Sequence, residues 1–589
     1  MDSPHGAFRS FFEGLALTAL AALLFAASFP NPVFENGIAL LAWVAYVPVF
    51  LLVYRTSLGS SVLWGALYGY SAYLLLNYWL ANFHQLAGIV VYSIYMVYMA
   101  ALFFALRLAV VFFGQKAYIA HWVIWLGYEY LRTTGFLGYP YGITGYSQWR
   151  MTAVIQIADI FGVYGVSALV VFPSAWIAAA FGRQTENGTV LQAGTKPPFA
   201  GCFRQAACIL AAFFRREKIP AIAWFAALVA ALLYGLAAKT DFSSAPHANI
   251  ALIQQNGNSW HGDVEEYRRD LEILTRLSDQ ALAADPKPDM VVWPETAFVP
   301  RIYWHLTYRD PGYRETWQVV KELLDYLEKQ DVPFVIGNDD ARMDPVLNRN
   351  EDFLVRYNAA LLFRGREIAG IYRKMHLVPF TEHFPFEKQL PFVYRFLLDA
   401  DTNFWQPGTE ATVFSGPGFR FSTPICFEDS FGDISRKFVQ NGAGFLVNLT
   451  NDAWAKSLSS QNQHLAMAVF RAVENRRSMV RATASGQTCG ILPDGSIAAM
   501  APPFSQVWLN VSLPVVKDRF TVYTRIGDLA GKAFAVAAVV LLIVGAVLCI
   551  IRNAHGSSAR ASGILSVADS KSRPPSGKGG KEGKHGRPK

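Results

Sequence analysis

Residues 421–429 read FSTPICFED, a short run of apolar and β-branched residues that ends in a cysteine with two acids close behind it. Such a run is typical of a β-strand that delivers one side chain to a loop. Cys426 therefore has the position of a nucleophile. A nucleophilic thiol needs a base that accepts its proton and a cation that stabilises the charge developing on the attacked carbonyl.

Two upstream motifs supply candidates for the base and the cation. Glu295 ends the strand-like run VVWPE at 291–295, and Lys374 ends the run IYRK at 371–374. A nearby cation lowers the pKa of a thiol. The pKa of the thiol then lies closer to that of a carboxylate, which can accept its proton more easily. For Cys426 alone, the alternatives are a buried core thiol and a disulfide with Cys489 in an oxidising compartment.

The order Glu, Lys, Cys, with each residue in its own short motif, resembles the nitrilase superfamily. The flanking residues resemble its membrane-bound branch, the apolipoprotein N-acyltransferases. The matching motifs are RKMHLVPF at 373–380 with Glu382 behind it, Cys-Phe-Glu at 426–428, and NDAW at 451–454.

The resemblance implies a role for each of these side chains. Cys426 would form a thioester, Glu295 would act as general base, and Lys374, with a backbone amide near the cysteine, would stabilise the oxyanion. Glu382 and Glu428 stand at positions where the family needs a carboxylate, and we expect them to keep Lys374 protonated and oriented.

Three further residues are weaker candidates for substrate binding: Trp260, Phe427 and Trp454. Phe427 stands where many relatives have Tyr, so any role of that hydroxyl is absent here. His376 adjoins the lysine motif without matching a catalytic position in the family, and we interpret it as structural.

Composition places much of the chain in lipid. Of 589 residues 53% are hydrophobic and only 16% are charged, which is too apolar for an ordinary soluble protein. The net charge of +8 comes from loops beside apolar runs and from the C-terminal tail, so it indicates membrane topology and not a nucleic-acid groove. The five cysteines have no metal-ligand spacing, and neither a metal nor a cofactor is expected.

Apolar runs of about 17–25 residues, long enough to cross a bilayer, predict eight transmembrane spans. They lie near 14–29, 36–54, 61–82, 88–113, 119–134, 160–181, 219–238 and 532–551. For the first run, a cleaved signal peptide is the alternative. The fifth carries Glu129 and Arg132, which either line a substrate route or form an ion pair that reaches the membrane surface.

The distribution of Lys and Arg predicts the orientation. Arg9, Arg55, Lys116 and the 183–218 loop fall on one side, and the loops on the other side near 30–35 and 83–87 carry no Lys or Arg. By the positive-inside rule the basic side is cytoplasmic. The large polar block is thus expected on the outer face, and the resemblance implies a bacterial inner membrane with this block in the periplasm.

That polar block alternates short apolar strands with polar helical stretches, a pattern typical of an α/β layered domain. The resemblance implies the αββα sandwich of the nitrilases, so the predicted fold class is a polytopic α-helical membrane domain plus a nitrilase-like sandwich. The predicted domains are a seven-helix membrane domain at 1–238, the catalytic domain at 239–531, a transmembrane helix at 532–551 and a disordered basic tail at 552–589.

Setting and resemblance together predict an acyltransferase, because a site against the bilayer can hold an acyl chain away from water. The implied reaction moves an acyl chain from a phospholipid, such as phosphatidylethanolamine, through a cysteine thioester to the α-amine of diacylglyceryl-cysteine on an apolipoprotein. We expect a monomer without nucleic-acid partners. The alternatives are a membrane-anchored amidase or nitrilase and a transporter or scaffold with an inactive outer domain.

Overall fold

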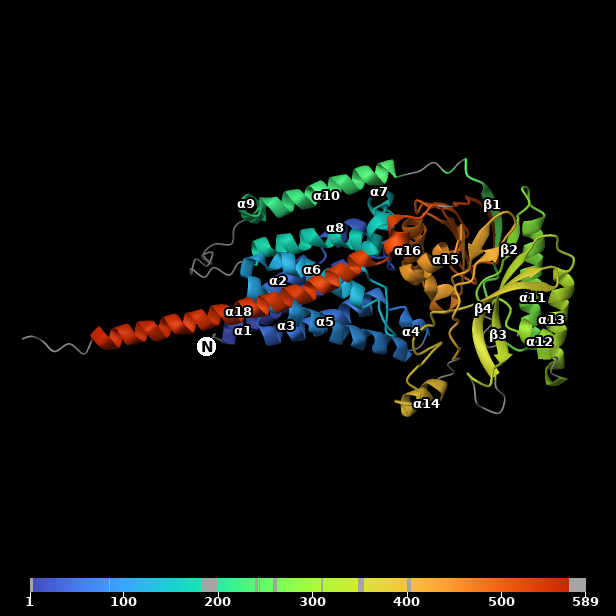
Figure 1. The fold of residues 1–589 in the computed structure, drawn as a ribbon, viewed down its shortest axis with the longest axis horizontal. Helices are drawn as coiled ribbons and strands as arrows, with labels where there is room; N and C mark the ends of the chain where they lie inside the picture. The colour runs from blue at the N-terminus through green and yellow to red at the C-terminus, as the bar shows by residue number, and fades with distance from the viewer. Residues whose placement is uncertain are drawn as a thin grey trace, which may run out of the picture.

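The computed structural model describes residues 4–83, 85–182, 199–238, 242, 244–257, 262–308, 311–347, 354–399, 404–517 and 519–570. A bundle of long helices forms one half of the molecule, and an α/β domain, here called the catalytic domain, lies at one end of that bundle (Figure 1).

Helical segments stand at all eight predicted span positions. The elements of the membrane domain are α1 (Pro4–Ser28), η1 (Ala39–Trp43), α2 (Val47–Arg55), α3 (Leu58–Leu76), α4 (Leu80–Phe83), α5 (Gln85–Phe113), η2 (Gly114–Lys116), α6 (Ala117–Leu131), η3 (Thr144–Gln148), α7 (Thr152–Ile155), α8 (Ala158–Phe181), α9 (Phe199–Arg216), α10 (Lys218–Ala237) and α18 (Leu529–Ser570).

Five helical segments among the described residues are long and apolar enough to cross a membrane. They are Phe11–Ser28, Ala87–Leu131, Ala158–Phe181, Lys218–Ala237 and Leu529–Ala554. The second of these comprises α5 and α6, which η2 separates. The chain is therefore a membrane protein, and the number of eight crossings stays a prediction.

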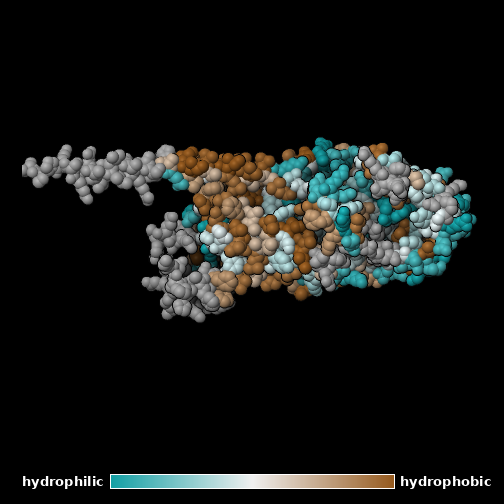
Figure 2. All heavy atoms as spheres, turned by 90° about the horizontal axis from the view of Figure 1, so that it is seen from below, coloured by the Kyte–Doolittle hydropathy of each residue, from teal (hydrophilic) through white to brown (hydrophobic). Residues whose placement is uncertain are grey.

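The surface of the helical half is apolar. Figure 2 shows hydrophobic side chains over the helices and hydrophilic ones over the catalytic domain. Leu63, Leu233 and Val536 are 73%, 63% and 64% exposed on three different helices. Soluble proteins rarely expose an apolar surface of this extent to water, whereas such a surface is expected in contact with the hydrocarbon of a bilayer.

Two six-stranded sheets form the centre of the catalytic domain. The first has the order β12-β1-β2-β3-β4-β5 and the second β11-β10-β9-β8-β7-β6. The strands are β1 (His247–Gln254), β2 (Met290–Val292), β3 (Phe334–Met343), β4 (Leu354–Arg364), β5 (Glu367–Arg373), β6 (Phe414–Ser415), β7 (Arg420–Ser422), β8 (Phe445–Thr450), β9 (Ser478–Thr483), β10 (Cys489–Ile491), β11 (Ile497–Met500) and β12 (Val507–Pro514).

The catalytic domain also contains helices and short 3-10 turns. They are α11 (Val264–Leu282), α12 (Ile302–Tyr308), η5 (Pro311–Tyr313), α13 (Arg314–Leu327), α14 (Pro391–Asp399), η6 (Cys426–Ser430), α15 (Gly432–Gln440), η7 (Ala453–Ala455), α16 (Leu458–Asn475) and α17 (Val522–Ile526). Of these, α11 and α13 pack on the first sheet (Figure 1).

The side chains of β1 point alternately to the two faces of the first sheet, which explains how the helices and the two sheets form layers. Ala251 and Ile253 pack against helices α11 and α13, whereas Ile250 and Leu252 join the core between the two sheets. Successive side chains of a strand point to opposite faces, so a strand with both faces buried is apolar throughout. The predicted αββα sandwich is confirmed.

Helix α16 joins the catalytic domain to the membrane domain. Residues 459–475 of this helix are all buried. The Gln463 side chain donates hydrogen bonds to the carbonyl oxygens of Pro30 (2.9 Å) and Leu76 (3.0 Å), and Arg476, just after the helix, lies 2.6 Å from Asp159 of α8. The two halves thus share one interior.

The strand before the cysteine is shorter than predicted. Strand β7 ends at Ser422, a single bridge pairs Ile425 with Leu449, and the chain then enters η6 at Cys426. Pro424 has no N–H to donate to a neighbouring strand, which explains the interruption.

The C-terminal helix is longer than predicted. Helix α18 continues to Ser570, beyond the predicted end at residue 551, so residues 552–570 are helical where a disordered tail was expected. Extending a helix that already exists avoids the cost of nucleation, and Ala and Arg in this stretch favour helix. Residues 571–589 lie outside the described part of the chain.

Glu129 and Arg132 are buried, with 2% and 5% exposure, so the ion pair at the membrane surface is wrong. Glu129 accepts a hydrogen bond from the Thr144 amide (2.9 Å). Arg132 donates to the Tyr95 hydroxyl (2.8 Å) and to the Tyr139 carbonyl (2.9 Å). Both charges hold the loop after α6 against the helices.

Candidate active site

Lys374 lies between two carboxylates. It follows β5 directly, and its side chain is fully buried. Its Nζ is 3.3 Å from Glu295 Oε1 and 2.8 Å from Glu382 Oε1. Burial alone lowers the pKa of Lys374, but the carboxylates of Glu382 and Glu295 and the Cys426 thiol raise it well above its usual value. The ammonium therefore keeps its proton.

Glu295 is fixed by donors from both sheets. Its Oε1 also accepts a hydrogen bond from Asn358 Nδ2 (2.8 Å), and its Oε2 accepts one from the backbone N–H of Asn451 (2.9 Å). Asn358 belongs to β4 of the first sheet, and Asn451 follows β8 of the second. Hydrogen bonds to an ionised group are stronger than neutral ones, so this carboxylate has one orientation.

Cys426 starts η6 with a positive φ of 49°, a conformation that non-glycine residues rarely adopt and that marks functional sites. Burial raises the pKa of its thiol well above the usual value, Glu295 raises it further, and Lys374 opposes both. The thiol is thus neutral at neutral pH. Cys426 and Cys489 are both free, so the disulfide alternative is wrong.

Glu382 holds Lys374 as expected. Besides its contact with the ammonium, it accepts a hydrogen bond from the Val378 amide through Oε2 (2.9 Å). Burial raises the pKa of Glu382, and the Lys374 ammonium opposes the rise. One carboxylate thus fixes both the lysine and the loop that follows it.

Glu428 makes different contacts from those expected. Its carboxylate accepts hydrogen bonds from the backbone amides of Met375 (2.8 Å), His376 (3.0 Å) and Ile425 (2.8 Å), and from the Tyr372 hydroxyl (2.7 Å). Burial raises its pKa to about 7. Glu428 thus joins the lysine loop to the cysteine turn through the backbone.

Comparison with known proteins identifies two family domains in this chain. Residues 21–176 match the apolipoprotein N-acyltransferase N-terminal domain, and residues 249–515 match the carbon-nitrogen hydrolase domain. Apolipoprotein N-acyltransferase 1 of Treponema denticola is 43% identical over 538 residues, which cover 89% of this chain and 94% of that protein. Apolipoprotein N-acyltransferase 1 of Treponema pallidum is 44% identical over 564 residues, 93% of this chain and 98% of that one.

The chain belongs to the apolipoprotein N-acyltransferase family.

Two solved structures each cover just under half of this chain. Saccharomyces cerevisiae Nit3, a member of branch 10 of the nitrilase superfamily, covers 47% of this chain and 92% of its own, with 19% identity and a TM-score of 0.33. A carbon-nitrogen hydrolase from Helicobacter pylori covers 46% of this chain and 89% of its own, with 16% identity and a TM-score of 0.33.

Two of the three weaker candidates lie close to the site. Trp454 packs on Trp79 of the membrane domain, with ring centroids 5.6 Å apart. Phe427 is buried and packs against Phe431 at 4.9 Å and His376 at 5.9 Å. Trp260 lies outside the described residues.

Sequence reasoning did not find four buried charged residues behind the cysteine turn, here called the charged network: Asp429, Asp452, His464 and Arg481. His464 Nε2 is 2.7 Å from Asp429 Oδ1 and His464 Nδ1 is 3.0 Å from Asp452 Oδ1. The guanidinium of Arg481 pairs with Asp429 and lies 3.5 Å from Asp452. Asp429 lies in the 421–429 motif and Asp452 in the 451–454 motif, but no sequence motif marks His464, which lies within helix α16.

The side chains of the described residues include no cluster of three His, Cys, Asp or Glu suited to a metal ion. The charged groups of the site are Lys374, its two carboxylates and the charged network. Such an arrangement can move a proton between a thiol and a carboxylate beside a fixed ammonium.

Proposed function

We propose that this enzyme transfers an acyl chain from a membrane phospholipid, such as phosphatidylethanolamine, to the N-terminal α-amine of a diacylglyceryl-cysteine apolipoprotein. Cys426 is the nucleophile, Glu295 the general base, and Lys374 the cation that stabilises the oxyanion. The reaction is a ping-pong transfer through a thioester.

In the first half, the Cys426 sulfur bonds to the acyl carbonyl carbon, and its proton passes to Glu295. The carbon–oxygen bond to the glycerol breaks, and Glu295 returns the proton to that oxygen, so a lysophospholipid leaves. In the second half, the α-amine attacks the thioester, the carbon–sulfur bond breaks, and the proton lost by nitrogen returns to the sulfur through Glu295.

The observation that carries this proposal is the buried contact of Lys374 with Glu295 beside a neutral thiol. A neutral thiol attacks only when a base accepts its proton during the step. Glu295 is the carboxylate in that position, and three hydrogen bonds orient it. The Lys374 ammonium already stands where negative charge develops.

The surroundings of the cysteine favour a lipid donor. Tyr141, in the loop that follows α6, lies within electrostatic range of Cys426. Its ring is 5.3 Å from that of Trp79, which in turn packs on Trp454. A group of aromatic rings from both domains therefore lies near the nucleophile, and such surroundings suit an acyl chain better than a small polar amide.

The orientation of the helices supports a periplasmic catalytic domain in a bacterial inner membrane. Helix α3 ends beside the catalytic domain, where Tyr78 contacts Ser457 (3.0 Å). Arg55 and Lys116 lie at the opposite helix ends, which the positive-inside rule places in the cytoplasm. We further propose a monomer with eight crossings, because this one chain supplies every group of the site.

The proposal is tested by feeding the purified protein phospholipid that is radiolabelled in its acyl chain. We expect label on the protein that hydroxylamine releases and that Cys426→Ala abolishes. Cys489→Ala, which removes the other cysteine of the catalytic domain, is the matched control and keeps the label. Absence of label, label that survives Cys426→Ala, or rapid release of free fatty acid without an acceptor would each contradict acyl transfer.

A further inference from the structure

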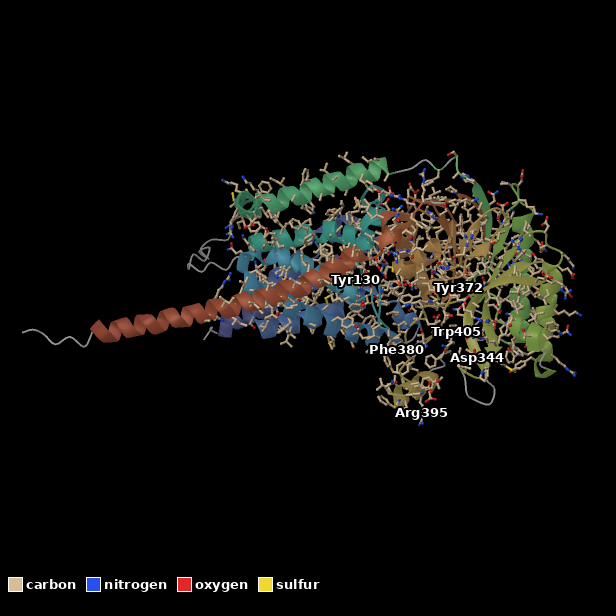
Figure 3. The ribbon with its side chains drawn as sticks, in the orientation of Figure 1. Tyr130, Asp344, Tyr372, Phe380, Arg395 and Trp405 are labelled. Carbon is tan, nitrogen blue, oxygen red and sulfur yellow. The ribbon has the colours of Figure 1, made fainter. Side chains whose placement is uncertain are left out.

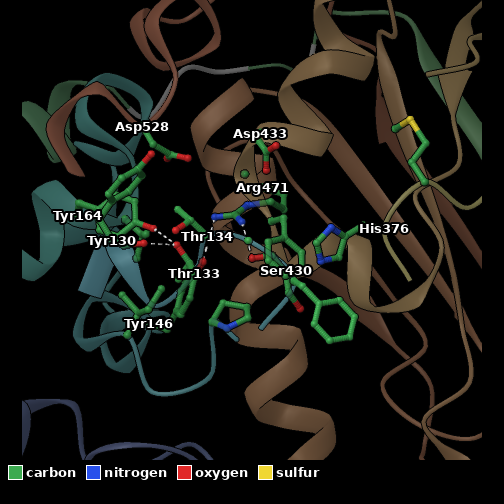
Figure 4. A pocket seen from close by; sticks show the side chains of 18 of the residues that line it. Tyr130, Thr133, Thr134, Tyr146, Tyr164, His376, Ser430, Asp433, Arg471 and Asp528 are labelled. Atoms are coloured by element: carbon green, nitrogen blue, oxygen red, sulfur yellow. Dashed lines mark hydrogen bonds between the residues drawn. The ribbon is translucent and has the colours of Figure 1, made fainter. Parts of the chain in front are cut away.

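A cavity lies between the membrane domain and the catalytic domain. Its volume is about 590 Å³, and it is lined by the end of α6 and the loop behind it, the first turns of α8 and α18, the loop after β5 and the segment after η6 (Figure 4). Glu295, Lys374 and Cys426 are not among its lining residues. The cavity is thus separate from the catalytic site.

The cavity stands at the level of lipid headgroups. The candidate span Ala87–Leu131 ends at it, and Leu529–Ala554 begins at it. Tyr130 and Tyr164, which line it, lie at the ends of two apolar helices, and Figure 3 shows Tyr130 where the helices meet the catalytic domain. Tyrosine is enriched where hydrocarbon gives way to headgroups.

Charges of both signs border this cavity. Lys532 and Arg471 bring positive charge, and Asp433 and Asp528 bring negative charge. Figure 4 shows Asp433, Asp528 and Arg471 gathered along one wall. Lys532 and Asp433 are exposed, whereas Arg471 is only 1% exposed.

Three buried polar atoms of lining residues have no hydrogen-bond partner among the described residues: Ser430 Oγ, His376 Nε2 and Arg471 Nε. Ser430 and Arg471 are each 1% exposed. A buried donor or acceptor without a partner costs free energy, which a polar ligand offsets when it brings partners or ordered water into the cavity.

We propose that this cavity binds the headgroup of a zwitterionic membrane lipid that carries a phosphate and a primary ammonium. The phosphate pairs with Lys532, within the field of Arg471, and the ammonium donates hydrogen bonds to Asp433 and Asp528. A quaternary ammonium has no N–H for these carboxylates, and an anionic headgroup without an amine leaves both of them facing it unpaired.

A ligand in this cavity contacts the two segments that directly follow Lys374 and the Cys426 turn. Residues 375–377 and 430–432 line the cavity, and Glu428 holds the amides of Met375 and His376 on their other side. A bound headgroup therefore stabilises the lysine loop and the cysteine turn. This lipid is additional to the acyl donor, so the inference goes beyond the proposed function.

The test measures retained lipid by native mass spectrometry on the full chain in detergent. All measurements use protein that carries Cys426→Ala, so that acyl transfer cannot consume the lipid. The result of the binding test is therefore independent of whether the proposed acyl transfer takes place. Phosphatidylethanolamine, phosphatidylglycerol and phosphatidylcholine are offered separately. Asp433→Asn and Lys532→Gln alter the cavity at exposed positions, and Asp331→Asn and Lys287→Gln remove an exposed ion pair elsewhere.

We expect one phosphatidylethanolamine to bind about tenfold more tightly than the other two lipids, and each cavity variant to weaken that one lipid about tenfold, the effect of one charge-assisted hydrogen bond. The control variants Asp331→Asn and Lys287→Gln are expected to bind phosphatidylethanolamine as tightly as the unchanged protein. Glycerophosphoethanolamine competes at millimolar concentration, and inorganic phosphate does not. Equal retention of all three lipids, insensitivity to both cavity variants, or displacement by phosphate alone would overturn the proposal.

Discussion

His464 brings a positive charge into the interior beside the proposed nucleophile. Burial alone lowers its pKa, but Asp429 and Asp452 raise it to about 9. Asp452 adjoins Asn451, whose amide orients Glu295, and Asp429 belongs to the turn that Cys426 begins. The charged network thus adjoins the amide that orients the proposed base and belongs to the turn that carries the proposed nucleophile, and we expect its members to be positioning residues.

The protonation of His464 predicts how stability depends on pH. An unfolded chain releases this proton near pH 6.5, whereas the folded protein retains it up to about pH 9. The stabilisation, of the order of 3 kcal/mol, is therefore fully present below pH 6.5 and is lost as pH rises through 9. We expect thermal unfolding in detergent to show a falling Tm over this range.

The variant His464→Gln separates this effect from other titrations. It is expected to unfold at a lower temperature than the wild type at pH 6, and the difference is expected to shrink as pH approaches 9. Two Tm curves that run parallel from pH 6 to 9 would show that the histidine carries no stabilising proton.

The proposed catalytic residues were predictable because each stands in a contiguous motif that follows a strand within a few residues. The contacts of Glu428 were not, because three of its four partners are backbone amides, which no sequence pattern marks. His464 was missed for a related reason. Its partners come from η6 and from the loop after β8, and only the packing of α16 on the second sheet brings them together.

Strand β3 passes unusually close to the segment that carries the proposed base. A Cβ at Gly337 would lie 2.1 Å from the Pro294 carbonyl oxygen and 2.8 Å from the Glu295 Cα. Only glycine permits this approach of two backbones. The position of Glu295 therefore depends on a residue of a neighbouring strand with no chemistry of its own.

We expect Gly337→Ala to displace Glu295, to lower acyl-transfer activity at least tenfold and to lower the free energy of unfolding by about 1–3 kcal/mol. Activity and chemical denaturation check the two effects. Gly365→Ala is the matched control, since Gly365 has a φ of +54° and open space around it. That change is expected to cost about 1 kcal/mol and to keep activity, and an active Gly337→Ala would contradict the argument.

Helices and strands were predictable from the sequence where the hydrophobic periodicity and the length of a segment indicated the same kind of element. The alternation of short apolar strands and polar helical stretches that predicted an α/β layered domain corresponds to elements such as β1, α11 and the β4–β5 hairpin, which turns at Gly365. The turn η6 and helix α14 were missed. The first depends on Pro424 ending the strand, and the second is a nine-residue helix without a buried residue, so it has little core to mark it.

The molecule as a whole has one polar end and one apolar body. Helix α18 returns along the bundle and packs on α6, where Gly127 lies against Ala535 and Trp122 against Phe534. The last helix is thus part of the same bundle as the first ones. Composition predicted this division, but the pairing of α18 with α6 depends on small residues far apart in the sequence.

The proposed orientation predicts which positions an external reagent reaches. Val346 is 80% exposed in the catalytic domain, and Lys116 is exposed at the opposite end of the helices. In cells with a permeabilised outer membrane, a membrane-impermeant maleimide is expected to add label to Val346→Cys and none to Lys116→Cys until the cells are lysed. Labelling of Lys116→Cys in intact cells would contradict a periplasmic catalytic domain.

The burial of α16 on all sides has a consequence for biosynthesis. The ribosome completes this helix after α1 to α10, and its polar side chains then find carbonyl partners at Pro30 and Leu76, which belong to segments made long before. A nascent chain that has not yet entered the bilayer lacks those partners. The helix therefore completes these hydrogen bonds only when the membrane domain is in place, and we expect α16 to pack after that domain has assembled.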